Sequence, residues 1–120
     1  MADIVWVSFI ETPVFQSAWQ QLGLSLADLF ALQNLLLANP QLGPVIRGAG
    51  GLRKARFSPV GSGRGKRGAL RIGYALFPKA GRIALLAVYP KSAKVDLSPP
   101  ERAAAKSLIE HMRRAWEEER

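Results

Sequence analysis

The chain has 120 residues, of which 48% are apolar and 22% charged, a composition typical of one globular domain. It contains no cysteine, which excludes disulfides, thiolate catalysis and cysteine-ligated zinc. Its first residues carry acids where a signal peptide needs lysines, and no apolar run approaches the roughly twenty residues that cross a bilayer. We therefore expect a single soluble domain over residues 1–120, cytoplasmic and without membrane association.

Positive charge is confined to one part of this sequence. Seventeen Lys and Arg against nine Asp and Glu give a formal net charge of +8. Twelve of these cations and no acid lie between Arg47 and Lys94, whereas residues 1–46 contain no Lys or Arg. Such a window attracts polyanions, and each cation that meets a phosphate adds affinity by releasing condensed counterions. The pattern favours a nucleic-acid partner over a merely soluble basic surface.

The first third of the chain predicts a strand followed by two helices. Residues Ile4–Ile10 are β-branched and aromatic, as in a buried strand. The Thr12-Pro13 pair supplies an N-cap and a first-turn proline, and Gly23 ends the helix that begins there. Ser25 caps a second helix that ends before Pro40. Because a two-residue joint separates these helices, we expect a helical hairpin.

The middle of the chain predicts three more strands. Residues 40–51 have loop composition and precede a short strand, Leu52–Phe57. Ser58–Gly68 is a glycine-rich basic segment, which we expect to be a mobile loop. The strands Arg71–Phe77 and Arg82–Tyr89 are joined by a Pro-Lys-Ala-Gly turn and form a hairpin.

A second basic connection, Pro90–Asp96, leads to the last helix. Ser98, two prolines and Glu101 form a strong helix start, and the helix should run to about residue 119. The order β-α-α-β-β-β-α predicts an α+β fold: an antiparallel sheet with the helical hairpin on one face and a C-terminal helix. In this arrangement the second face of the sheet is free for function.

The basic residues of the predicted strands fall on one face. Side chains alternate along a strand, so Lys54 and Arg56 point the same way, as do Arg71 and its neighbours two residues apart. If the other faces pack on the hairpin, these cations converge on the open face, where a bent phosphodiester would fit. A solvated strand face is the alternative. The candidate catalytic set is Arg71, Lys54, Arg56, Lys91 and Lys94.

Conventional catalytic motifs are not found in the sequence. The single histidine, His111, lies in the last predicted helix and is expected to be a surface or boundary residue. The acids are scattered, so we predict no metal site and no cofactor. The segment Gly61–Lys66 resembles a phosphate-binding loop only loosely, because it lacks the Gly-Lys-Ser/Thr ending.

Four segments resemble the RelE/HigB family of toxins from bacterial toxin–antitoxin systems. They are GGLRKARF at residues 50–57, GKRGALR at 65–71, LLAVYPK at 85–91 and DLS at 96–98. The resemblance implies a ribosome-dependent endoribonuclease that cuts messenger RNA and is silenced by a cognate antitoxin. No metal is implied: the RNA's own 2′-hydroxyl attacks the adjacent phosphate, and cationic side chains stabilise the charge that develops.

The same resemblance assigns roles to individual residues. Arg71 matches the arginine expected at the scissile phosphate, the Lys54/Arg56 pair matches the basic strand, and Lys91 and Lys94 match the cations after the last strand. Tyr74 is expected to pack in the core or to shape the site. Further RNA contacts are expected from Arg53, Arg64, Lys66 and Arg67.

Small residues depart from the bulky pattern of such toxins and leave a second interpretation open. Gly73 and Ala75 share a face with Arg71, and Ala84 lies on the partner strand, so the sheet would be hollowed there. The chain is then either a divergent toxin or a non-catalytic, even engineered, interaction module with an opened apolar groove. Trp116 would pack on its own sheet, or dock into a neighbour and form a homodimer through the C-terminal helix. The gyrase-poisoning branch of the superfamily fits the dense cations less well.

Overall fold

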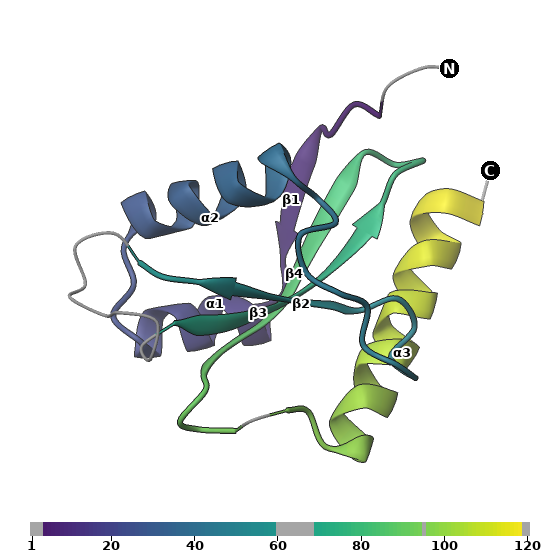
Figure 1. Cartoon of the computed structure of the whole chain (residues 1–120). Coiled ribbons are helices and arrows are strands. Elements are labelled where there is room, and N and C mark those ends of the chain that lie inside the picture. The colour runs from purple at the N-terminus through teal and green to yellow at the C-terminus, as the bar shows by residue number, and fades with distance from the viewer. Residues whose placement is uncertain (1–3, 60–68, 95, 119–120) are drawn as a thin grey trace.

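The computed structural model describes residues 4–59, 69–94 and 96–118. It shows an α+β fold with a four-stranded sheet and three helices (Figure 1). The elements are β1 (Ser8–Glu11), α1 (Pro13–Gln21), α2 (Leu26–Ala38), β2 (Arg53–Phe57), β3 (Leu70–Phe77), β4 (Arg82–Pro90) and α3 (Pro99–Arg113), followed by a π-helical segment, η2 (Arg114–Glu118).

The sheet is mixed, so the prediction of an antiparallel sheet is wrong. Its strand order is β1-β4-β3-β2, in which β4 and β3, and β3 and β2, form antiparallel pairs. β1 runs parallel to β4, with Ser8 opposite Arg82 and Glu11 opposite Leu85. Strand direction depends on the route of the connection, and the residues between β1 and β4 are numerous enough for a parallel return. Local sequence carries no signal for that choice.

β1 is also shorter than predicted. Residues 4–7 lie outside it, because β4 begins only at Arg82 and offers them no partner. The amides of Val7 and Ser8 instead donate to the carbonyl of Gly81, at 2.6 and 3.2 Å. Both side chains of Val5 and Val7 are about three-quarters exposed, at 73% and 75%. The chain therefore enters the sheet from an apolar, solvent-facing segment.

The helical hairpin covers one face of the sheet, and its starts are confirmed. The Thr12 hydroxyl accepts from the amide of Phe15 at 3.1 Å, and Ser25 and Asp28 form a reciprocal capping box. The main core lies between these helices and the sheet. Its members include Phe15, Trp19, Leu32, Leu36, Phe57, Ile72, Tyr74 and Leu85.

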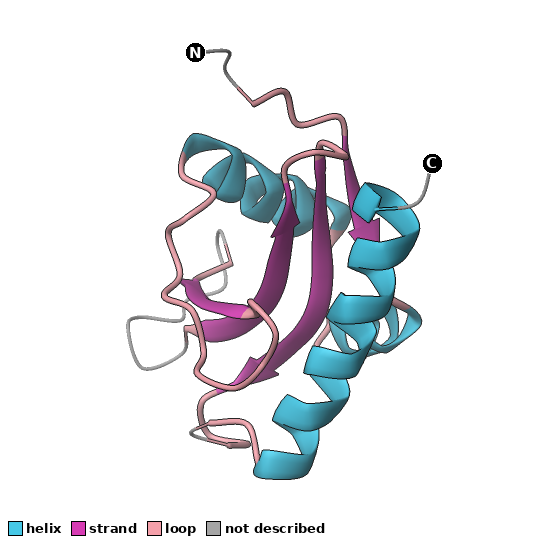
Figure 2. Ribbon diagram, turned by 90° about the vertical axis from the view of Figure 1, so that its right-hand side faces the viewer, coloured by secondary structure: helices cyan, strands magenta, loops and turns pink. Residues whose placement is uncertain are grey.

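The other face is not free along its whole length, because α3 packs against it (Figure 2). Ile109 and Met112 of α3 are buried against a second apolar cluster that includes Phe77 and Leu86. A bulge between Gly73 and Tyr74 shifts the register, so that both Leu86 and Ala87 belong to this cluster. The part of the face that α3 leaves uncovered lies toward the paired ends of β2 and β3.

None of the helices in the described residues has the length and apolarity needed to cross a membrane.

Candidate nucleic-acid interface

Two arginines stand directly opposite each other on the β2–β3 ladder. Arg56 pairs with Arg71, and Lys54 pairs with Gly73, so the basic residues of the two strands share one face as the alternation predicted. That face lies opposite the helical hairpin, whose core receives the intervening Ala55 and Ile72. Like charges in directly opposed positions destabilise a sheet. The pairing of Arg56 with Arg71 is therefore unfavourable for the sheet itself.

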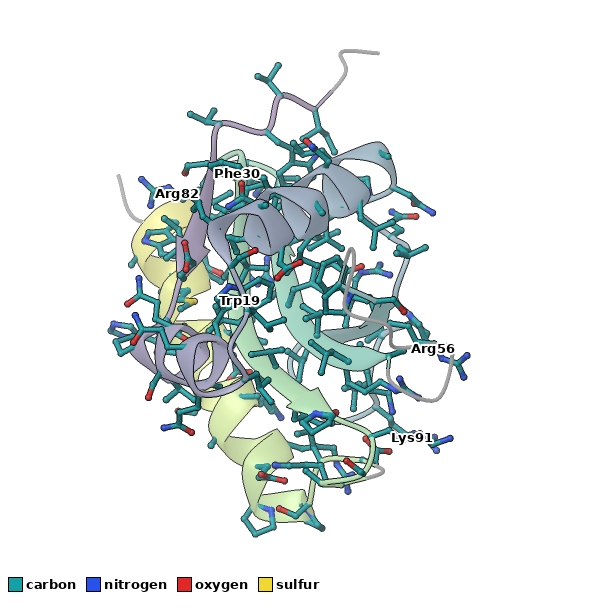
Figure 3. All side chains as sticks on the ribbon, turned by 90° about the vertical axis from the view of Figure 1, so that its left-hand side faces the viewer. Trp19, Phe30, Arg56, Arg82 and Lys91 are labelled. Atoms are coloured by element: carbon teal, nitrogen blue, oxygen red, sulfur yellow. The ribbon has the colours of Figure 1, made fainter. Side chains whose placement is uncertain are left out.

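These cations line a cleft of about 540 Å³. Its wall consists of Leu42, Pro44, Lys54, Ala55, Arg56, Arg71 and Lys91. Four of the five predicted catalytic residues thus meet in one cavity. Arg56 and Lys91 lie near each other at the edge of the molecule, far from the labelled Phe30 on α2 (Figure 3). Among the described residues that line this cleft, none is acidic.

Arg71 is the most buried cation of the cleft, with 7% of its surface exposed. Its Nη1 donates to the carbonyl of Ala69 at 3.4 Å, and no described carboxylate lies within ion-pair distance of it. A buried charge without a counter-ion is unfavourable unless it has another use. Across the two ladders, Arg71 is paired with Arg56 on β2 and with Tyr89 on β4.

Acidic residues beyond the last strand hold two of the lysines. The Lys54 Nζ lies 3.4 Å from Asp96 Oδ1, which also accepts from the amide of Leu97 at 2.8 Å. That amide, and then the Lys54 charge, keep the pKa of the Asp96 carboxyl below its usual value. The pair fixes the connection after β4 to the rim of the cleft.

Lys94 does not line the cleft with the other four cations. Its Nζ is 2.5 Å from Glu101 Oε2 and 5.2 Å from the centre of the Tyr89 ring. Glu101 also accepts from the amide of Ser98, so one carboxylate both caps α3 and holds Lys94. The hydrogen bond from Lys94, followed by that from Ser98, lowers the pKa of Glu101 to about 2. Glu101 is therefore charged throughout the physiological range.

Of the four residues predicted to contact RNA beyond the catalytic set, only Arg53 lies within the described residues, and it does not line the cleft. Arg53 pairs with Tyr74 on the hairpin side of the sheet, and its Nη1 donates to the Gly43 carbonyl at 2.8 Å. Its role in the structure is to hold the loop before β2. Arg64, Lys66 and Arg67, with the other residues from 60 to 68 of the glycine-rich segment, lie outside the described residues.

Tyr74 is a core residue that supports one wall of the cleft. Its hydroxyl donates to the Pro40 carbonyl at 2.7 Å and accepts from the amide of Gly43 at 2.9 Å. Burial raises the pKa of this hydroxyl, so it remains a donor at neutral pH. The loop is drawn so close that a Cβ at Gly43 would stand 2.5 Å from the Lys54 carbonyl oxygen. Leu42 and Pro44 are thereby set against β2.

The small residues predicted to open a groove are buried instead. Ala75 and Ala84 are fully covered, and Gly73 is buried beside Leu52 and Ala87. Their small size lets α3 approach the sheet closely. Trp116 packs within its own chain, with its ring edge-on to Phe77 at 5.0 Å and the Arg82 guanidinium 4.9 Å from its centre. The sequence predicted an exposed groove at Gly73, Ala75, Ala84 and Trp116, and the structure has none at these residues.

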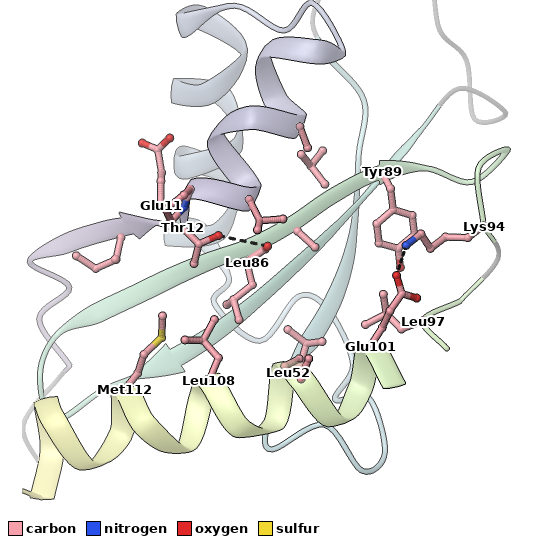
Figure 4. Close-up of a pocket in the computed structure, with 18 residues that line it drawn as sticks. Glu11, Thr12, Leu52, Leu86, Tyr89, Lys94, Leu97, Glu101, Leu108 and Met112 are labelled. Atoms are coloured by element: carbon pink, nitrogen blue, oxygen red, sulfur yellow. Dashed lines mark hydrogen bonds and ion pairs between the residues drawn. The ribbon is translucent and has the colours of Figure 1, made fainter. Parts of the chain in front are cut away.

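An open apolar groove lies instead over β4, the neighbour of the strand that carries Gly73 and Ala75 (Figure 4). It has a volume of about 610 Å³ and runs over β4 between α1 and α3. Val14 and Ala18 form one wall, and Leu108 and Met112 form the other. Lys94 and Glu101 close one end, and the Thr12 hydroxyl donates to the Leu86 carbonyl at 3.4 Å in its floor. The groove is separate from the cationic cleft, because the described residues that line the two have no member in common.

His111 is exposed on α3, and within the described residues no three His, Asp or Glu side chains gather as a metal site. Sequence reasoning missed Asp96, Glu101 and Tyr89. Glu101 was visible as a helix cap, but its second role needs the approach of Lys94 in space. Tyr89 had one available signal: it lies next to Pro90 at the end of a strand on the same sheet face as Arg71. Asp96 and Lys54 are 42 residues apart, beyond the reach of any local pattern.

A comparison with protein-family models finds none that matches the chain.

Proposed function

We propose that this protein is a toxin of the RelE/HigB type, a ribosome-dependent endonuclease that cleaves messenger RNA without a metal. One observation carries the proposal: Arg71, Arg56, Lys54 and Lys91 line one cleft, in which the described residues include no carboxylate. A cleft with walls of one sign concentrates the field on an anionic ligand. The residues quoted above for their resemblance to these toxins include the strand pair and the arginine that build this cleft.

The resemblance to these toxins implies the chemistry, and the placement of the cations suits it. The 2′-oxygen of the RNA forms a bond to the adjacent phosphorus, and the bond from phosphorus to the 5′-oxygen breaks. The products are a 2′,3′-cyclic phosphate and a 5′-hydroxyl, which takes up one proton as the 2′-hydroxyl loses one. Negative charge grows on the phosphate oxygens as the fifth bond forms. Arg71 offers them a fixed guanidinium fork, and Arg56 and Lys54 neutralise the flanking phosphates.

The ion pair between Lys54 and Asp96 sets the resting position of one cation. Lys54 is partly exposed and reaches Asp96 at 3.4 Å, a long contact with a solvated carboxylate. An exposed pair of this kind contributes little to stability. A phosphate that enters the cleft can therefore take Lys54 from Asp96 without a large penalty.

The proposed partners are messenger RNA on the ribosome and a cognate antitoxin protein, and the proposed compartment is the cytoplasm. The antitoxin would offer acidic side chains to the cleft or apolar ones to the groove between α1 and α3. Either contact would oppose cleavage. Acidic side chains in the cleft would do so directly, because they would occupy the cations.

A toxicity assay with matched variants tests the proposal. Expression of the wild type should arrest growth, and RNA from those cells should carry new 2′,3′-cyclic ends within translated messages. Arg71→Ala should abolish both effects. Lys79→Ala is the control, because it removes a cation from the exposed β3–β4 turn, away from the cleft. Equal growth of cells expressing wild type and Arg71→Ala, with both proteins soluble, would refute the enzyme.

The apolar groove supports a second candidate, a non-catalytic interaction module on the same fold. Its walls are almost entirely aliphatic, and pockets of this size and composition bind apolar ligands or helices. Leu108→Glu places a charge in the groove and leaves the cationic cleft intact. If the effect of expression on cells survives Arg71→Ala but is lost in Leu108→Glu, the protein is an interaction module and the toxin proposal is wrong.

A further inference from the structure

Only one of the four cations that line the cleft has an acidic partner among the described residues. Three ion pairs are found there, and that of Lys54 with Asp96 is the only one that involves a cation of the cleft. No described carboxylate lies within ion-pair distance of Arg56, Arg71 or Lys91. Within residues 4–59, 69–94 and 96–118, Asp96 is thus the only acid that pairs with a cation of the cleft.

The start of α3 fixes the Asp96 carboxylate independently of Lys54. Its Oδ1 accepts from the amide of Leu97 at 2.8 Å, whereas the Lys54 Nζ is 3.4 Å away. Leu97 is buried against the sheet, and its carbonyl accepts from the Arg102 Nη1 at 2.8 Å. Because Leu97 is held in this way, the Asp96 carboxylate stays at the rim of the cleft when Lys54 turns away from it.

Asp96 also has a distinctive place in the sequence. Residues 29–95 contain no Asp or Glu, and the twelve Lys and Arg between Arg47 and Lys94 all lie in that stretch. Asp96 is the first acid after it, and it reaches a lysine of the cleft that lies 42 residues earlier. The side chains of Lys54 and Asp96 are 26% and 53% exposed, and a solvated pair of this kind contributes little to stability. The pair therefore acts mainly on what enters the cleft.

We propose that Asp96 is a positioning residue that competes with the RNA backbone for Lys54. The inference rests on the proposed function, because it requires that the cleft binds phosphates. In the empty cleft the ammonium group of Lys54 lies against the Asp96 carboxylate. A phosphate that binds at this position must replace the carboxylate, so the ion pair that is lost cancels part of its interaction with Lys54.

This competition lowers the affinity of the cleft for substrate and product alike. Cleavage leaves a 2′,3′-cyclic phosphate on one fragment, and that phosphate still carries a negative charge for Lys54 to bind. When Lys54 returns to Asp96, the product loses one of its contacts. Binding energy that is equal for the substrate and the transition state does not speed the chemical step, so its reduction has little effect on catalysis. Asp96 therefore assists the release of product.

The affinity for a short single-stranded RNA with 2′-O-methyl groups tests the competition, because this RNA lacks the attacking hydroxyl and cannot be cleaved. Asp96→Asn removes the charge and keeps the oxygen that accepts from the Leu97 amide. By fluorescence anisotropy at about 0.1 M salt, this variant should bind the RNA roughly two to five times more tightly than the wild type. The gain should shrink as the salt concentration rises toward about 1 M, because salt screens the ion pair. A purely structural effect would not follow the salt concentration in this way.

Glu110→Gln is the matched control for that measurement. It changes the net charge by the same amount at an exposed position of α3 that does not line the cleft. Its affinity for the RNA should therefore stay close to that of the wild type.

A Lys54→Met background shows whether Asp96 acts through Lys54. In that background Asp96→Asn should give a smaller gain in affinity, because the carboxylate no longer has an ammonium group to hold. Thermal unfolding checks that each variant is folded, and Asp96→Ser provides a second variant without the charge.

Two results would overturn the role of Asp96 and leave the proposed function standing. One is a folded Asp96→Asn protein that binds the RNA only as tightly as the wild type, and the other is an equal gain in both backgrounds. A wild-type protein that binds no RNA even at low salt would refute the proposed function and the role of Asp96 together.

Discussion

Arg56 and Arg71 occupy directly opposed positions on β2 and β3, and no described carboxylate lies within ion-pair distance of Arg71. Sheets normally avoid opposed like charges, and Arg71 is largely buried as well. Under the proposed function, this arrangement weakens the folded state and serves to bind a phosphate. Stability and activity should therefore respond in opposite directions when Arg71 is replaced.

Arg71→Met tests that opposition. Methionine keeps the aliphatic length of the side chain and removes the buried charge, so the free energy of unfolding should rise by about 1 kcal/mol. Chemical denaturation measures this change, and toxicity on expression should be lost in the same variant. Arg56→Met is the comparison: Arg56 is exposed, and its replacement should affect stability less. A clear fall in stability for Arg71→Met would show that the guanidinium serves the fold.

The ion pair between Glu101 and Lys94 should make stability depend on pH in acid. The pKa of Glu101 in the folded protein is about 2, below the ordinary value of 4.5 for a free glutamate, so the folded state favours the charged carboxylate. Its contribution is fully present above pH 4.5 and is lost as the pH falls toward 2. Denaturation at a series of pH values should show a steeper acid loss for the wild type than for Glu101→Gln. Glu110→Gln, at an exposed position of α3, should keep the wild-type slope.

Gly43→Ala should disturb both the fold and the cleft. The added Cβ would lie 2.5 Å from the Lys54 carbonyl oxygen, and overpacking of this kind costs about 1–3 kcal/mol. The displaced loop would also lose the hydrogen bond from the Gly43 amide to the Tyr74 hydroxyl. Leu42 and Pro44, which line the cleft, would move with it, so RNA cleavage should fall.

Gly48→Ala is the control for that variant. Gly48 has a φ of 74° and open space around it, so alanine there should cost only about 1 kcal/mol of backbone strain. Its cleavage activity should be unchanged. If Gly43→Ala and Gly48→Ala are both folded and cleave equally well, the position of the loop at Gly43 does not matter for cleavage.

Ala75→Leu tests whether small residues seat α3. Ala75 is fully buried opposite Ala84, so a larger side chain must push the helix away, at about 1–3 kcal/mol. Ala104→Leu, on the exposed side of α3 at the open groove, should change stability by less than about 0.5 kcal/mol. If the Ala75→Leu protein is stable and has a binding cavity at this position, the apolar groove that the sequence predicted at Gly73, Ala75 and Ala84 can form after all.

Local signals in the sequence predicted the helices and the common face of the cations. Thr12, Ser25 and Ser98 each cap a helix as their neighbours indicated, because capping depends on residues within one turn. Alternation along β2 and β3 placed Lys54, Arg56 and Arg71 on one side, since the period of a strand is fixed by its backbone.

Contacts between distant segments were beyond the sequence. The parallel direction of β1, the cover that α3 provides for Ala75 and Ala84, and the ion pair from Lys54 to Asp96 all depend on how remote parts of the chain meet. The contact of Arg53 with the Gly43 carbonyl was also beyond the sequence, because Gly43 belongs to a loop without any pattern of its own.

The parallel pairing of β1 with β4 determines the order in which a newly made chain can fold. The Thr12 hydroxyl and the Leu86 carbonyl that it meets are 74 residues apart. A ribosome adding about 5–20 residues per second needs on the order of 4–15 s to span that gap. Throughout this time the hydrophobic N-terminal strand has no partner, and chaperones that bind extended apolar peptides can reach it. Completion of the domain is thus a late event in its synthesis.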